Sequence, residues 1–212
     1  MNQLATKIAR LLCNNANGSF FEEEIRYGIE VTLGALFQIA IIIATALLLG
    51  LGQEVLATLS AAALYRRFSG GAHCQAYYRC TIVSLITYIL LGYLSKYIPV
   101  YYLPGYIIFL MVFSVLIVHY RVPVDNPAKM ITDESQKKRL KLKSFLVLLL
   151  LLAAIIITGY FIGQKLLAIC LLLGLFWQNL TLLRLGHVYI DIWDRFFAGI
   201  EKLLVGKEVM KC

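Results

Sequence analysis

The sequence predicts an all-α integral membrane protein: one domain over residues 1–212 that crosses the bilayer about six times. Of the 212 residues, 60% are hydrophobic and only 15% are charged, whereas soluble domains have about 25% charged residues. Long apolar segments recur along the chain, and basic residues are confined to alternate connections. These observations exclude a soluble protein. The net charge of +8 therefore indicates orientation in the membrane and not a nucleic-acid partner.

The apolar segments fall into two groups by length. A spanning helix needs about 20 apolar residues, because each residue rises about 1.5 Å across roughly 30 Å of hydrocarbon. Residues 55–65 and 81–98 are shorter or mixed, so we expect short, tilted or re-entrant helices there. A four-span bundle with a re-entrant hairpin over 55–95 is the alternative. Within a transmembrane bundle over residues 29–183, the four long segments are 29–52, 101–119, 145–163 and 166–183.

Both ends of the chain are expected to be amphipathic helices at the membrane surface. In residues 1–28, apolar residues recur at helical spacing beside Lys7 and Arg10, before a capping box from Ser19 to Glu22. Residues 184–212 again place apolar side chains on one helical face. The apolar residues are Leu4, Ile8, Leu11 and Leu12 at the first end, and Trp193, Phe196, Phe197, Ile200, Leu203 and Leu204 at the second.

The basic residues predict the orientation. Of the 20 Lys and Arg residues, only Lys96 and Lys165 fall outside four segments that a six-pass chain with a cytosolic N-terminus places in the cytosol. Such asymmetry follows the positive-inside rule. We therefore expect both termini and the basic connections in the cytosol, with 120–144 as the only substantial linker. The four cytosolic segments are 1–28, 66–80, 120–144 and 184–212.

Residues 66–80, RRFSGGAHCQAYYRC, combine two glycines, an imidazole and two thiols between apolar segments. A cysteine protease needs a thiolate, a base and donors for the developing oxyanion. Cys80 falls where the next helix begins, and there the helix dipole and backbone N–H groups favour a thiolate. Arg79 and the Arg66-Arg67 pair add positive potential. Cys80 and His73 are therefore the candidate nucleophile and base.

The spacing of this pair requires a bend. In one continuous helix, His73 and Cys80 would lie about 10.5 Å apart along the axis, too far for a hydrogen bond of about 3 Å. We predict that the chain bends between Gly70 and Cys80, because glycine tolerates positive φ. Cys74, next to His73, is expected to point elsewhere. The residue that orients His73 stays open among Gln75, Ser69, Asp125 and Asn126.

Other interpretations compete with this one. His73 could cap a loop, the thiols could be inert, and the arginines could set topology in a non-enzymatic transporter subunit or assembly factor. A metal-dependent membrane enzyme is a further alternative, but His73, Cys74 and Cys80 lack the four ligands of a structural zinc site. We expect no metal and no cofactor. In otherwise apolar spans, Gln38, Gln178 and Asn179 are expected to hydrogen-bond between helices.

The segment from Arg66 to Cys80, with Gly70-Gly71-Ala72-His73 and a cysteine seven residues after the histidine, resembles the accessory gene regulator B family. Tyr27-Gly28 at the start of the first span and the proline-containing residues 120–129, YRVPVDNPAK, resemble further segments of that family. One departure is Met130, where the family commonly has proline. The resemblance covers nearly the whole chain.

The resemblance implies a membrane cysteine endopeptidase of bacterial quorum sensing, with its active site at the cytosolic face of the plasma membrane. Cys80 would be the nucleophile and His73 the general base, while Arg66 and Gly71 match supporting positions. The implied partner is a short propeptide with an amphipathic leader and an acidic tail. Cleavage of the tail through a thioester acyl-enzyme, followed by capture by the propeptide's own cysteine, yields a thiolactone ring. A homodimer is implied as well.

Overall fold

The computed structural model describes residue 6, residues 22–124 and residues 133–209. Within these ranges the secondary structure is helical and contains no β-strand, which confirms the predicted all-α class. The predicted helix and capping box within residues 1–21, and the proline segment from residue 125 onward, lie outside the described residues. The chain separates into two compact units, residues 1–45 and 46–212, and each is described by itself.

The first unit contains most of helix α2 (Glu22–Leu48). Its residues Gly28–Leu48 are long and apolar enough to cross a membrane. The predicted span over 29–52 therefore ends earlier than expected. Gly50 has a φ of 67°, a left-handed conformation that glycine adopts without strain, and it turns the chain toward the next helix.

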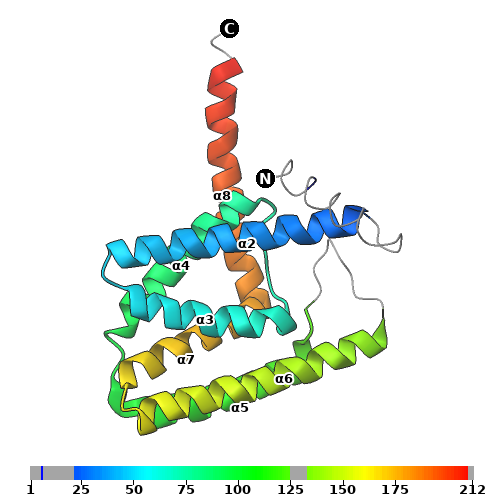
Figure 1. Ribbon diagram of the computed structural model, residues 1–212. Helices are drawn as coiled ribbons and strands as arrows, with labels where there is room; N and C mark the ends of the chain where they lie inside the picture. The colour runs from blue at the N-terminus through cyan, green and yellow to red at the C-terminus, as the bar shows by residue number, and fades with distance from the viewer. Residues whose placement is uncertain (1–5, 7–21, 125–132, 210–212) are drawn as a thin grey trace. The chain divides into compact units, whose positions relative to one another are not determined.

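The second unit is built around two helices, α3 and α7, which pack most extensively against each other (Figure 1). Helix α7 also contacts α4, α5, α6 and α8, so it lies at the centre of the unit. The elements of this unit are α3 (Gly52–Ser69), α4 (Tyr77–Ser95), the 3₁₀ turn η1 (Val100–Tyr102), α5 (Leu103–Arg121), α6 (Glu134–Ile156), the π-helical turn η2 (Ile157–Phe161), α7 (Lys165–Thr181) and α8 (Arg184–Val209).

Small residues allow helix α3 to pack closely against α7. A Cβ atom on Gly174 of α7 would lie 2.1 Å from the Thr58 carbonyl oxygen of α3, so the two backbones approach as closely as they do only because residue 174 is glycine. Ala61, Ala62 and Tyr65 of α3 are fully buried. One side of this helix is thus covered by protein, whereas Leu56 and Leu64 on it are exposed.

Within the residues that the structure describes, four helices, or five if one bent pair is counted, meet the length and hydropathy of a membrane span, so the predicted number of about six is approximate. Residues 77–95 qualify, although the sequence alone left 81–98 uncertain. Helix α3 does not qualify, and α7 qualifies only together with α8, from which it is bent by 85°. The spans are Gly28–Leu48, Tyr77–Ser95, Val100–Arg121 and Glu134–Phe161, with Lys165–Thr181 plus Arg184–Leu203 as the bent fifth.

The predicted linker 120–144 is too long. Helix α6 begins at Glu134, eleven residues before the predicted span at 145. Asp133 caps it: its carboxylate accepts bonds from the Ser135 backbone N–H at 2.9 Å and the Ser135 hydroxyl at 2.8 Å. The hydropathy pattern missed these basic first turns because a capped, charged helix start has no apolar run.

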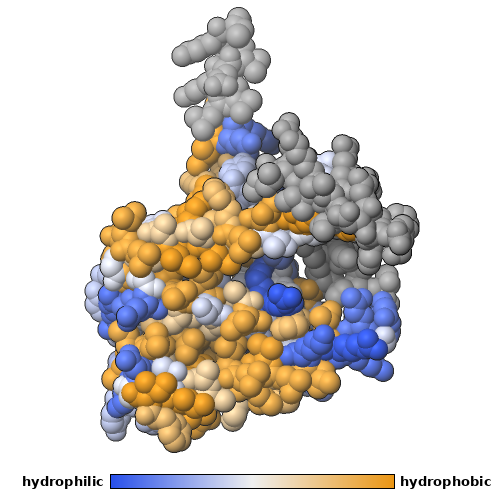
Figure 2. Space-filling view, viewed as in Figure 1, coloured by the Kyte–Doolittle hydropathy of each residue, from blue (hydrophilic) through white to orange (hydrophobic). Residues whose placement is uncertain are grey.

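The two ends of the second unit differ in chemistry. At one end tyrosines gather, with the Tyr93 and Tyr97 hydroxyls 2.7 Å apart and the Tyr101 and Tyr102 rings 5.2 Å apart. The other end carries the arginines of α3 and the lysines of α6. Figure 2 shows hydrophobic side chains over most of the visible surface between these ends, and hydrophilic ones over the first turns of α6. Such a surface suits a multi-pass membrane protein with an aromatic belt at one interface.

Candidate active site

The connection between α3 and α4 carries the residues singled out from the sequence. Helix α3 ends at Ser69, and Gly70 and Gly71 follow with φ values of 76° and 142°. The chain then runs to Ala76, the extended N-cap residue of α4. The predicted bend between Gly70 and Cys80 is thus confirmed, and it depends on backbone conformations that favour glycine.

Two distant segments hold this connection in place. The Val124 N–H donates to the Ser69 carbonyl at 2.9 Å, and the Ala72 N–H donates to the Thr181 carbonyl at 3.2 Å. A Cβ on Gly70 would lie 2.1 Å from the Val124 carbonyl oxygen. The site segment is therefore fitted between the end of α7 and the chain that leaves α5.

Arg66 of α3 reaches across the connection to the imidazole. Its Nη2 donates to the Ala72 carbonyl and lies 3.1 Å from Nδ1 of His73. A guanidinium group has donors only, so Nδ1 must accept this bond, and a neutral His73 then carries its proton on Nε2. Arg66 therefore fixes both the position and the tautomer of the ring.

Gln178 of α7 supports Arg66 from behind. This side chain is fully buried. Its Oε1 accepts a bond from Nη1 of Arg66 at 3.4 Å, and its Nε2 donates to the Gly70 carbonyl at 2.8 Å. One amide thus holds the arginine and the glycine turn at the same time. The expected hydrogen bonding between helices is confirmed for Gln178, and for Asn179, which donates to the Ser114 hydroxyl at 2.7 Å.

Gly71 is closely surrounded by the side chains of Arg66, Gln178 and Thr181. A Cβ at this position would lie 2.8 Å from the Thr181 hydroxyl and 3.1 Å from both Nη1 of Arg66 and Nε2 of Gln178. Its φ of 142° is also one that side-chain-bearing residues rarely adopt. The predicted supporting position therefore has a physical reason to be glycine.

Cys80 lies in the first turn of α4, where its N–H donates to the Ala76 carbonyl at 3.1 Å. The thiol is half-buried, and its hydrogen-bonding neighbours are the His73 and Cys74 side chains and the Cys74 backbone N–H. Ala76 offers no side chain to cap the helix. The structure thus brings Cys80, His73, Arg66 and Gly71 into one site, with His73 exposed to solvent.

The expectation that Cys74 points away from the site is wrong. In the irregular backbone after Gly71, the neighbours His73 and Cys74 both reach Cys80, whereas in a regular helix or strand they would diverge. The hydrogen bond with Cys80, followed by burial, raises the pKa of Cys74 above its ordinary value. Cys74 therefore keeps its proton and can donate it to the Cys80 sulfur.

The other cations of the segment have different roles. Arg79, beside Cys80, pairs with Glu201 at 2.8 Å and with the buried Asp194 at 3.4 Å, both on α8. The Tyr78 hydroxyl also donates to Glu201. The charge of Arg79 is therefore balanced by α8, and Arg66 is the guanidinium that faces His73.

Of the four candidates for the residue that orients His73, the two that the structure describes, Ser69 and Gln75, have no recorded hydrogen bond to its ring. Nδ1 of the ring contacts Arg66, the Ser69 hydroxyl donates to the Gly70 carbonyl at 3.3 Å, and Gln75 is exposed. Asp125 and Asn126 lie outside the described residues. Within the described part of the chain, no three His, Cys, Asp or Glu side chains are placed to hold a metal ion. The sequence could not have revealed Gln178 as a member of the site, because it is separated from Arg66 by 112 positions.

Comparison with known families decides the identity. The family model for accessory gene regulator B matches residues 3–182. The chain belongs to the accessory gene regulator B family. The matched region includes the whole site from Arg66 to Cys80. It also includes Gln178 and Thr181 of α7, which hydrogen-bond to the site.

Related proteins agree with this assignment. A protein named AgrB-like from Clostridium perfringens strain SM101 is 31% identical over 188 residues, covering 82% of this chain and 87% of the relative. A second AgrB-like protein, from C. perfringens strain 13, is 30% identical with the same coverage. One from Clostridium acetobutylicum is 25% identical over 77% of this chain and 76% of the relative. No solved structure matches the chain.

Proposed function

We propose that this protein is a membrane cysteine endopeptidase that removes the C-terminal tail of a quorum-sensing propeptide and closes the remainder into a thiolactone. The observation that carries the proposal is that the bent connection after α3 brings His73 beside Arg66 of α3 and Cys80 of α4, at the start of a membrane-spanning helix. Membership of the accessory gene regulator B family fits a role in propeptide processing.

In the proposed first step, the Cys80 thiolate attacks the carbonyl carbon of the scissile peptide bond. The Cys74 thiol, which retains its proton, and the Cys74 N–H stabilise the thiolate before attack. Backbone N–H groups in the first turn of α4 then stabilise the oxyanion. His73, which took the proton of the Cys80 thiol and is then an imidazolium, gives a proton to the leaving amine and returns to its neutral form; the C–N bond breaks, and Cys80 holds the peptide as a thioester.

In the second step, the propeptide's own cysteine attacks the thioester carbonyl. His73, now neutral again, takes the proton of the incoming thiol. The bond between the carbonyl carbon and the Cys80 sulfur breaks, the thiolactone forms, and Cys80 leaves as a thiolate. The two sulfur–carbonyl bonds are nearly equal in energy, so the exchange keeps the activation of the original acyl group and needs no external energy source.

Charge supports the choice of substrate. The basic residues at the site end of the second unit, from Arg66 and Arg67 on α3 to the lysines in the first turns of α6, would attract an acidic tail through long-range potential. We place this end at the cytosolic face by the positive-inside rule. We also propose that the protein acts as a homodimer, as the family resemblance implies.

The test is cleavage of the propeptide from the neighbouring short reading frame by purified, full-length protein in lipid vesicles. Cys80→Ala and His73→Ala should each abolish formation of the released tail and of the thioester, both detected by mass spectrometry. Cys80→Ser should fail as well, because a hydroxyl loses its proton far less readily than a thiol. The two losses should not add, because either residue alone disables the unit.

The matched control is Cys170→Ala, which removes a buried thiol on α7 away from the site and should leave cleavage intact. Chelator present throughout should change nothing. Cleavage that persists in a folded, inserted Cys80→Ala protein would contradict the proposal and favour a transporter subunit or assembly factor. Loss of activity with chelator would favour a metal-dependent enzyme.

A further inference from the structure

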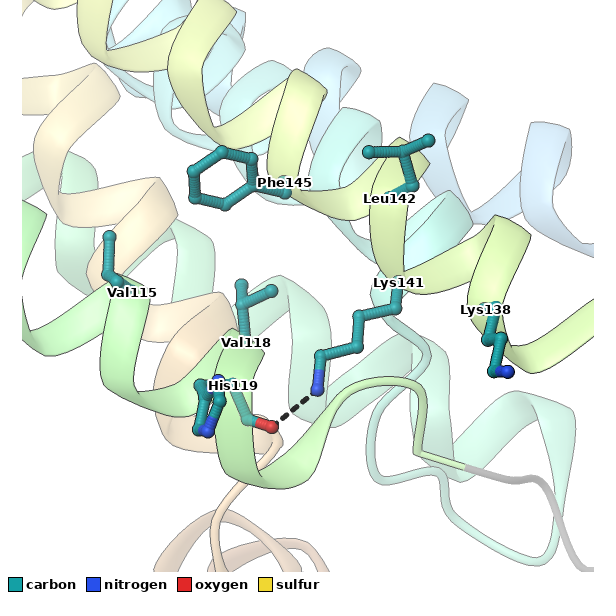
Figure 3. Close-up of a pocket in the computed structure, with 7 residues that line it drawn as sticks. All are labelled: Val115, Val118, His119, Lys138, Lys141, Leu142 and Phe145. Atoms are coloured by element: carbon teal, nitrogen blue, oxygen red, sulfur yellow. Dashed lines mark hydrogen bonds between the residues drawn. The ribbon is translucent and has the colours of Figure 1, made fainter. Parts of the chain in front are cut away.

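A groove between α5 and α6 is not used by the proposed reaction. It has a volume of about 340 Å³ and lies between the last turns of α5 and the first turns of α6 (Figure 3). We name it the α5–α6 groove. It is lined by Val115, Val118, His119, Lys138, Lys141, Leu142 and Phe145.

The groove is polar at one end and apolar along its length. On α6, Lys138, Lys141, Leu142 and Phe145 follow one another at helical spacing, so they share a face. Lys138 and Phe145 are seven residues apart, or about 10.5 Å along the axis. On α5, Val115 and Val118 form the facing wall (Figure 3). The arrangement matches a molecule with a negatively charged head and an alkyl chain.

Lys141 is held at the mouth of the groove. Its Nζ donates to the His119 carbonyl in the last turn of α5 at 2.6 Å, as the dashed line in Figure 3 shows. An ammonium group has three donors, so two remain for a ligand. Lys138 is exposed one turn earlier on the same face. In Figure 3 its ammonium group points away from that of Lys141, and an exposed lysine can turn to meet a phosphate as a point charge.

The surroundings add to this positive potential. Within the first turns of α6 there are five cations, at positions 137, 138, 139, 141 and 143. Only the first of these has an acidic partner among the described residues, Glu134 at 3.1 Å. Clusters of this size beside a membrane-spanning helix attract anionic lipids, by about 1 kcal/mol for each basic residue near the surface.

We propose that the α5–α6 groove binds an anionic phospholipid of the bilayer, with its phosphate between Lys138 and Lys141 and the start of one acyl chain along Val115, Val118 and Phe145. Both walls belong to helices long and apolar enough to span the membrane, so acyl chains surround the groove on its open side. Charge complementarity selects an anionic head over a zwitterionic one. This proposal does not rest on the peptidase chemistry, although Lys138 and Lys141 also belong to the basic cluster that would attract the acidic tail of the substrate.

The experiment measures lipid retention by the purified, full-length protein. The protein is exchanged into detergent with equal amounts of phosphatidylglycerol and phosphatidylcholine of identical chains, and retained lipid is counted by native mass spectrometry. Wild type should retain phosphatidylglycerol preferentially. The Lys138→Gln/Lys141→Gln variant should lose this preference by about 10- to 30-fold, as expected for two surface charges. Arg139→Gln/Lys143→Gln removes the same charge from residues that do not line the groove, and it should keep the preference.

A second pair of variants tests the apolar part without changing charge. Val115→Trp should fill the groove and lower retention of phosphatidylglycerol, whereas Val112→Trp, on the exposed face of α5 outside the groove, should not. Equal losses in the two charge variants, or in the two tryptophan variants, would overturn the proposal. Competition by glycerophosphate as effective as by the whole lipid would also overturn it, because the site would then recognise free phosphate.

Discussion

Two helices of the second unit begin in opposite ways. Helix α6 starts with its own cap: Asp133 accepts two bonds from Ser135, and Glu134 pairs with Lys137 one turn later. Helix α4 starts at Ala76 without a side-chain cap, and its start is shaped by residues far away in sequence. A helix N-terminus offers several N–H groups to an acceptor. At α6 the Asp133 carboxylate takes the Ser135 N–H, and at α4 no side chain caps the first turn, in which Cys80 lies.

The capped start of α6 and the uncapped start of α4 are suited to different roles. A local cap stabilises a helix and cancels the positive end of its dipole. A start without such a cap is less stable but can hold a negatively charged sulfur or oxygen. Distant groups, namely Arg66 of α3 and Gln178 and Thr181 of α7, supply the rigidity that the missing cap would give. Substitutions at and around the two helix starts test this contrast.

Gly71→Ala should lower the rate of propeptide cleavage by about 100-fold. The new Cβ would press on Thr181, Arg66 and Gln178 in a backbone conformation unfavourable by about 1–3 kcal/mol for a side-chain-bearing residue. The rate is measured in lipid vesicles. Gly199→Ala on α8, where a Cβ meets no atom within 4 Å, is the control. Equal rates for the two variants would show that the start of α4 does not depend on this turn.

Gln178→Ala should lower kcat by about 10- to 100-fold with little change in KM, because Arg66 loses a buried partner and no longer holds the His73 ring in one orientation. The matched control is Asn179→Ser, the adjacent and equally buried amide, which bonds to Ser114 instead. An equal fall in kcat for the control, at equal thermal stability, would reduce Gln178 to a packing role.

Ala76→Asp should give α4 the kind of cap that α6 has. We expect about tenfold slower cleavage near pH 7, because a carboxylate beside Cys80 opposes formation of the thiolate and competes for the same N–H groups. Thermal stability should stay the same or rise. Activity should recover as pH increases, since hydroxide then removes the thiol proton. A variant as active as wild type at pH 7 would refute the proposed use of the uncapped start.

Cys74→Ala should cost about three- to tenfold in rate, because the Cys80 sulfur loses one hydrogen-bond donor. Cys74→Ser, which keeps a donor, should cost less. Since the pKa of Cys74 is raised, its thiol should stay protonated, and iodoacetamide near pH 7 should modify Cys80 first, as peptide mass spectrometry would reveal. Faster modification of Cys74 than of Cys80 would reverse the assignment of the two thiols.

Asp133→Ala should leave cleavage unchanged and lower thermal stability slightly near pH 7. Hydrogen bonds from Ser135 lower the pKa of Asp133, so the folded state favours the carboxylate. This contribution is present above the ordinary carboxyl pKa of about 3.9 and is lost as pH falls through the lower folded value. The difference in melting temperature from wild type should therefore shrink at acidic pH. A difference that grows there would contradict the capping role.

The same contrast explains what could be predicted from the sequence. The segment from Arg66 to Cys80 is local, so its glycines, imidazole and thiols indicated both the site and the need for a bend. The start of α6 is local too, but its charges hid it from a search for apolar runs. Cys74 was misplaced because the rule for neighbouring side chains holds only for regular backbone. The support from α7 depends on how α3 and α7 pack, and no sequence pattern shows which buried amide will face Arg66.

The tyrosines at the far end of the second unit allow the depth of the Cys80 sulfur in the bilayer to be estimated. Tyr93 and Cys80 lie on one helix, thirteen residues apart, which is about 20 Å along its axis. With the tyrosines at one headgroup layer, the sulfur sits about 20 Å across a hydrocarbon layer of roughly 30 Å, short of the opposite surface. In the proposed reaction a scissile bond would have to be drawn beneath the headgroups to reach the sulfur, at a site where His73 is exposed to solvent. The peptide's own thiol would therefore have to outrun hydrolysis by proximity, because it is carried on the same chain as the thioester.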